Sequence, residues 1–144
     1  MKKDVRVFCV FSAAVALTAC AIKQDVRPVM GLQAGEEVCI VEAPAVREGF
    51  VKELQESLAR RGFEPRLLPE GTSPRECPLV VTYTARWSWD LTIYMSFAEI
   101  NVFRDGALAG SAKYDSTRGS ANMGKFIDAE TKVNELVSEL FPAR

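Results

Sequence analysis

The stretch Gly-Ser-Ala-Asn-Met-Gly-Lys-Phe, at residues 119–126, has the spacing of a phosphate-binding loop. Its two glycines are separated by four residues and followed by Lys125, between a predicted strand and a predicted helix. In such loops the next residue is Ser or Thr, because its hydroxyl holds magnesium, but here it is Phe126. Asn122 can cap the helix, and Phe126 begins its apolar stripe. We predict no nucleotide binding and expect Lys125→Ala to leave stability unchanged.

The sequence contains no histidine. Its absence removes the commonest general base, the Ser-His-Asp and Cys-His arrangements, and most zinc and iron sites. Ser116 stands beside Asp115 without a base that could activate it. Glu99 lies in a predicted strand, where a solvated face is the simpler interpretation. We expect no enzyme, no catalytic residue, no cofactor and no metal.

Two stretches carry the residue types that anchor protein interfaces, namely residues 85–94 and 113–119. The predicted corner at Asp90 and the strand ending near Asp115 can meet at one end of a meander, so we predict one surface there. Its members are Arg86, Trp89, Asp90, Tyr114, Asp115 and Arg118. Core packing is the alternative for Trp87 and Trp89. For Asp115 and Arg118 the alternative is a local turn bond and a surface ion pair.

The first twenty residues have the pattern of an export signal. Lys2, Lys3 and Arg6 precede an uncharged apolar run over residues 7–17. This run is too short to span a bilayer, which needs about 20 residues. It matches the hydrophobic part of a signal peptide, which we place at residues 1–19. A buried N-terminal helix is the alternative.

Leu17-Thr18-Ala19-Cys20 resembles the lipobox of bacterial lipoproteins. The resemblance implies cleavage before Cys20 and attachment of fatty acyl chains, palmitate among them, to that residue. Several chains hold a protein on a membrane stably, whereas one holds it marginally. Residue 21 is Ala rather than the Asp that retains such proteins at the inner membrane. The resemblance therefore implies an outer-membrane lipoprotein that faces the periplasm, in which lipid is the membrane contact.

The remaining cysteines fit an oxidising compartment. Cys9 leaves with the signal and Cys20 carries the lipid, so Cys39 and Cys77 remain as a pair. We predict a disulfide between them, with two separate buried thiols as the alternative. Loss of residues 1–19 removes three positive charges and one negative charge, which lowers the net charge from −1 to −3. A mildly acidic domain lacks the basic patch of a nucleic-acid-binding protein.

The mature chain has the length and composition of one domain, with 48% hydrophobic residues. Residues 20–35 show no periodicity and are predicted to be a lipidated tether, followed by a single domain over 36–144. Apolar spacing predicts helices over about 45–62 and 122–141. Strands are predicted over 37–42, 64–70, 79–89, 91–103 and 107–117, with a bulge near 98–99 and a hairpin turn at 104–106. The order β-α-β-β-β-β-α favours an α+β two-layer sandwich, a mostly antiparallel sheet with both helices on one face.

The stretches VREGF, CPLVVTYTARWSWDLTIYMSFAEI and KYDSTRGSANMGKFIDAE resemble a family of small uncharacterised lipoproteins of Gram-negative bacteria. The similarity covers about residues 37–142, and YDSTRG and FIDAE are its most specific parts. It implies lipid attachment at Cys20 and a place in the cell envelope, but no activity. We expect a non-catalytic accessory in envelope assembly or transport with a protein partner. A periplasmic module that binds a small ligand or lipid is the alternative, and a hydrolase lacks its histidine.

Overall fold

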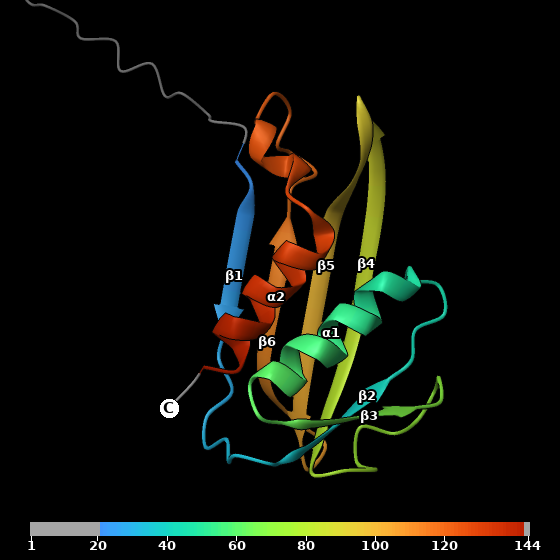
Figure 1. Ribbon diagram of the computed structural model, residues 1–144, viewed down its shortest axis with the longest axis vertical. Helices are drawn as coiled ribbons and strands as arrows, with labels where there is room; N and C mark the ends of the chain where they lie inside the picture. The colour runs from blue at the N-terminus through green and yellow to red at the C-terminus, as the bar shows by residue number, and fades with distance from the viewer. Residues whose placement is uncertain (1–20, 143–144) are drawn as a thin grey trace, which may run out of the picture.

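A single six-stranded sheet forms the body of the protein in the computed structural model, which describes residues 21–142 (Figure 1). The strand order is β1-β6-β5-β4-β2-β3. The strands are β1 (Lys23–Arg27), β2 (Glu37–Val41), β3 (Glu64–Leu68), β4 (Leu79–Asp90), β5 (Thr92–Arg104) and β6 (Ala107–Asp115). The helices are α1 (Glu48–Arg60), the short 3-10 helix η1 (Met123–Phe126) and α2 (Ala129–Leu140). The predicted signal peptide and Cys20 lie outside the described residues.

The sheet is mostly antiparallel, as the sequence predicts. β4, β5 and β6 form an antiparallel meander, and β1 pairs antiparallel with β6. β2 is parallel to both β3 and β4, because α1 carries the chain across from β2 to β3. Both long helices lie on the same side of the sheet, in front of it in Figure 1. The α+β class and the five predicted strands are therefore confirmed.

The predicted tether is wrong over the part that the structure describes. Residues 23–27 form β1, a strand that the sequence analysis did not predict, and they pair along their length with β6. Val29 is fully buried, and its N–H donates to the carbonyl oxygen of Leu140 at the end of α2. Arg104 ties the following loop to the sheet through Glu36, with an N–O distance of 3.0 Å. The folded domain thus begins next to residue 21 and not at residue 36.

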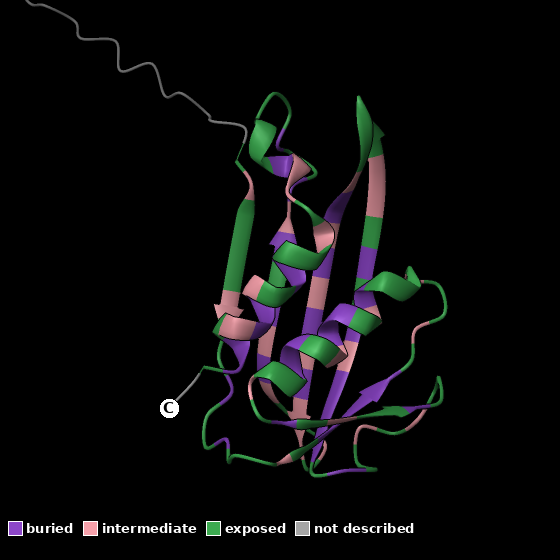
Figure 2. Cartoon of the chain, viewed as in Figure 1, coloured by how far each residue is buried: buried purple, intermediate pink, exposed green. Residues whose placement is uncertain are grey.

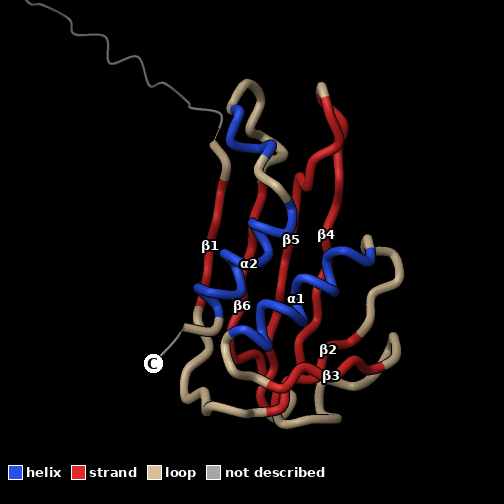
Figure 3. The backbone as a smooth tube through the Cα atoms, viewed as in Figure 1, coloured by secondary structure: helices blue, strands red, loops and turns tan. Residues whose placement is uncertain are grey.

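The β-bulge lies two residues before its predicted place. Arg86 pairs with Phe97 and Trp87 with Met95, so Ser96 is the extra residue on β5. Its hydroxyl receives a hydrogen bond from Ser88, at 2.8 Å. A bulge increases local twist. Beyond it, β4 and β5 continue together as a two-stranded hairpin that projects past α1 and α2 (Figures 1 and 3).

The last predicted helix is in fact two helices. The side chain of Asn122 accepts a hydrogen bond from the N–H of Gly124 and caps η1, as predicted. η1 ends at Phe126, and Asp128 then caps α2 by accepting from the N–H of Thr131. The chain therefore turns at Ile127, so η1 does not continue the axis of α2 and packs against a different part of the protein.

The core has two parts, one on each face of the sheet. The larger lies between the sheet and the two long helices, and Figure 2 shows buried residues, in purple, on both helices and on the strands behind them. The smaller lies on the opposite face and consists of Cys39, Val41, Leu68, Cys77 and Val80. The predicted disulfide is confirmed, with a Cα–Cα distance of 6.3 Å between Cys39 and Cys77. It fixes the loop after β3 against the sheet.

Candidate functional site: the projecting end of the hairpin

The tip of the β4–β5 hairpin carries apolar side chains that project into solvent. Trp89 is 76% exposed, Leu91 is 79% exposed and Ile93 is 55% exposed. Trp89 and Ile93 are partners in the strand register, with Leu91 at the turn between the strands. Figure 2 shows this end of the hairpin as exposed. A cluster of exposed apolar side chains indicates a surface that contacts another protein or a membrane.

Trp87 belongs to the core, unlike Trp89. It packs partly against the main core, and the guanidinium of Arg47 lies 5.0 Å from its ring centroid. Both tryptophans lie on the same face of β4, since alternate residues of a strand share a face. The helices cover that face at Trp87 but not at Trp89, so the two rings have different surroundings.

Lys125 of the phosphate-loop pattern is a buried structural residue. It is 4% exposed, and its ammonium donates to the carboxylate of Asp90 and to the carbonyl oxygen of Ser120. The same ammonium lies 5.5 Å from the ring centroid of Tyr94 and 5.1 Å from that of Phe126. Those two rings pack edge to face. Lys125 therefore joins η1 to the hairpin, and its positive charge is already satisfied.

Tyr114 does not belong to the predicted surface. It is 1% exposed and lies in the main core, with the ammonium of Lys132 5.0 Å from its ring. Its hydroxyl is buried without a hydrogen-bond partner among the described residues. Ala112 and Ser116, two residues away on either side, are buried as well. Strand alternation thus turns Tyr114 inward, away from any partner.

Asp115 makes the local turn bond that was the alternative interpretation. Its carboxylate accepts from the hydroxyl and the N–H of Thr117, and these bonds hold the pKa of Asp115 below its usual value. Arg118 is exposed and lines a shallow open cavity of about 280 Å³ with Lys23 and Asp115. Arg86 is exposed, and its guanidinium lies 4.7 Å from the ring centroid of Phe97.

The six predicted residues therefore do not form one surface. Trp89 and Asp90 lie on the projecting hairpin, and Tyr114 lies in the core. The polar residues Arg86, Asp115 and Arg118 lie near the C-terminal end of β6. The sequence analysis did not include Leu91, Ile93 or Met123 of η1 in the predicted surface, and all three are exposed. The signal that could have found Leu91 and Ile93 is their position in a hairpin that is longer than β6, whose last residue, Asp115, pairs with Phe97.

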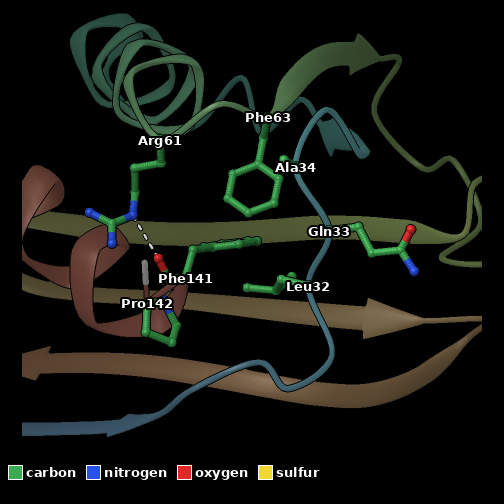
Figure 4. A pocket seen from close by; sticks show the side chains of 7 residues that line it. All are labelled: Leu32, Gln33, Ala34, Arg61, Phe63, Phe141 and Pro142. Carbon is green, nitrogen blue, oxygen red and sulfur yellow. Dashed lines mark hydrogen bonds between the residues drawn. The ribbon is translucent and has the colours of Figure 1, made fainter. Parts of the chain in front are cut away.

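An apolar hollow lies at the opposite end of the molecule (Figure 4). It measures about 280 Å³ and is lined mainly by Leu32, Phe63, Phe141 and Pro142. Phe63 and Phe141 pack edge to face, and the guanidinium of Arg61 donates to the carbonyl oxygen of Phe141 at 2.6 Å. These contacts are between helix ends and loops, and they close the core rather than present polar groups to a ligand.

Comparisons with known proteins identify the fold alone. No protein-family model and no curated protein matches the chain. Among solved structures, the chain is similar to a single-substitution variant of the PelC dodecamer from Paraburkholderia phytofirmans, with a TM-score of 0.62 and 16% identity, covering 86% of this chain and 100% of that one. It is also similar to the PelC dodecamer from the same organism, with a TM-score of 0.60 and 15% identity, covering 83% of this chain and 98% of that one. Within residues 21–142, no helix is long and apolar enough to cross a membrane. The chain shares its α+β fold with these oligomeric proteins.

Proposed function

We propose that the protein is a lipoprotein of the outer membrane that faces the periplasm and acts as a non-catalytic accessory in envelope assembly or transport. The observation that carries the proposal is the disulfide between Cys39 and Cys77, a bond typical of exported proteins. The N-terminal signal pattern and the lipobox-like residues before Cys20 agree with it. Absence of histidine from the whole sequence supports a role other than acid–base catalysis.

A non-catalytic role requires that the protein act through contacts. The similar solved structures are described as dodecamers, so we propose that this chain also acts as an assembly of its own copies. Native mass spectrometry of the purified lipoprotein tests this directly. A single high-order species supports it, and a monomer at all concentrations contradicts it.

The lipid and the compartment are tested together in the native host. Wild-type protein should carry acyl chains on Cys20, by mass spectrometry of its N-terminal peptide, and should fractionate with the outer membrane. Cys20→Ser should accumulate as an unprocessed, unlipidated precursor. Normal processing and membrane attachment of Cys20→Ser would contradict the proposal. In-cell cross-linking of the lipidated form then identifies the envelope partner.

Binding of a small ligand or lipid by the domain is the second candidate. The hollow beside Phe63 and Phe141 is the observation that favours it, because its lining is mostly apolar. The substitution Leu32→Glu would place a charged side chain in the hollow and should abolish ligand binding there. Lipid co-purification that is equal in wild-type protein and Leu32→Glu contradicts this candidate.

A further inference from the structure

The projecting hairpin and the start of β1, three residues after the predicted lipid attachment residue, lie at the same end of the molecule. Lys23, Asp115, Phe97 and Arg86 are successive partners across the sheet and form one row. Residues 21 and 22 precede Lys23 on the side of this row from which the hairpin extends. In Figure 1, β1 begins at the end of the molecule where the hairpin projects and η1 lies. The side chain of Ile22 lies beside η1, at Gly124.

The distances bring this end of the domain to the membrane. Cys20 precedes Lys23 by three residues, which span at most about 10 Å. Beyond Arg86 the hairpin extends to Leu91, five residues further, or about 17 Å at the rise of a strand. A lipid on Cys20 therefore brings the end of the domain that carries both this row and the hairpin to the bilayer. A long tether would have removed this constraint, but residues 23–27 are fixed in the sheet.

We propose that the hairpin tip is a second membrane contact, in which Trp89, Leu91 and Ile93 insert between phospholipid headgroups beside the anchor. The proposal rests on the lipidation at Cys20 proposed above. Amphipathic Trp rings prefer the headgroup region, and interfacial segments bury apolar side chains about 5–10 Å deep. Met123 of η1, 68% exposed, adds an apolar side chain at the same end.

The conformation of Leu91 supports this assignment independently. Its φ is 61°, in the left-handed region that Gly, Asn and Asp adopt with less strain. A strained, exposed leucine contributes nothing to the stability of the isolated domain. Strain of this kind points to a requirement outside folding. An apolar turn residue that enters a bilayer meets that requirement.

The charges around the tip suit a phospholipid surface. Lys23, Arg86 and Arg118 are exposed near the row where the hairpin leaves the sheet. The carboxylate of Asp90, which is nearest the turn, is paired with the ammonium of Lys125. Exposed cations and a neutralised acid at this level favour contact with anionic headgroups.

The test uses the lipidated chain with Trp87→Phe, in which Trp89 is the sole tryptophan. The protein is reconstituted into vesicles of phosphatidylethanolamine and phosphatidylglycerol. We expect brominated lipids to quench Trp89, its emission to shift to the blue, and acrylamide quenching to fall severalfold on transfer from detergent. Leu91→Asn with Ile93→Ser should reverse these changes, since Asn retains the turn. Leu108→Ser, an exposed apolar position at the other end of the sheet, should not.

Each outcome is decisive. Lipidated protein whose Trp89 stays open to acrylamide and unquenched by brominated lipid overturns the membrane contact alone. Protection from acrylamide without quenching by lipid, growing with protein concentration, also overturns it and assigns the tip to a second copy. An N-terminal peptide without acyl chains overturns the proposed function, and with it the geometry that brings the tip to the bilayer.

Discussion

Replacing Lys125 by Met tests whether the phosphate-loop pattern is a structural feature. The change keeps most of the side-chain volume but removes the charge that contacts Asp90, Ser120, Tyr94 and Phe126. We expect loss of stability at the junction between η1 and the hairpin, in contrast to the sequence-based expectation of no effect.

The magnitude follows from the individual contacts. The carboxylate of Asp90 is half exposed, so its ion pair contributes at most about 1 kcal/mol. A charged hydrogen bond to the carbonyl oxygen of Ser120 contributes about 1.5 kcal/mol, and each aromatic contact about 0.5–1 kcal/mol. These contributions share one ammonium and are not additive, and the methionine recovers apolar packing. We therefore expect a loss of about 2 kcal/mol.

Urea unfolding of soluble protein measures this loss as a midpoint lower by about 1 M, at a slope of about 2 kcal/mol/M. The matched control is Lys52→Met on α1, whose side chain is exposed, and its effect should stay below about 0.5 kcal/mol. Amide hydrogen exchange should accelerate in the hairpin rather than in α1. Equal midpoints for Lys125→Met and Lys52→Met would refute the structural role. ATP binding that Lys125→Met abolishes would restore the phosphate-loop interpretation.

The remaining predictions concern residues of the hairpin, the core and the disulfide. Trp89→Ala should change the free energy of unfolding by less than about 0.5 kcal/mol, because its ring is exposed, whereas Tyr114→Ala should cost about 3–5 kcal/mol. Tyr114→Phe should be neutral or stabilising, because it removes a buried hydroxyl that has no hydrogen-bond partner within residues 21–142. Replacing both Cys39 and Cys77 by Ala should cost about 4 kcal/mol for a sequence separation of 38, and an unchanged thermal midpoint would contradict this. Since the folded-state pKa of Asp115 is lowered, its stabilisation is complete above the unfolded pKa of about 4 and disappears as the pH falls through the folded value, which NMR titration measures.

The elements with strong apolar periodicity were predictable from the sequence. Residues 79–103 alternate over a long range and α1 has one apolar stripe, so both appear where expected. β1 was missed because it is an edge strand whose residues are mostly exposed, and only Val26 packs toward the core. An edge strand of charged residues has no alternation for sequence analysis to detect. Its pairing with β6 is a tertiary contact.

The candidate site was predictable only in part, for a related reason. Trp87 and Trp89 share a face of β4, and the sequence does not show where the helices that cover that face end. The opposite error occurred at Tyr114. Its residue type indicated an interface, but in the structure Tyr114 is buried, as are Ala112 and Ser116 two residues away on either side. Strand alternation was the better guide there.

The phosphate-loop pattern now has a complete account in packing. A Cβ on Gly119 would lie 2.9 Å from the carbonyl oxygen of Ser116, and one on Gly124 would lie 3.0 Å from Oδ1 of Asn122. The first glycine thus permits the turn out of β6, and the second permits the cap of η1. Lys125 neutralises Asp90 of the hairpin. The two glycines and Lys125 of the pattern are each required by a neighbour in this fold, and together they position the end of the domain from which the apolar hairpin projects.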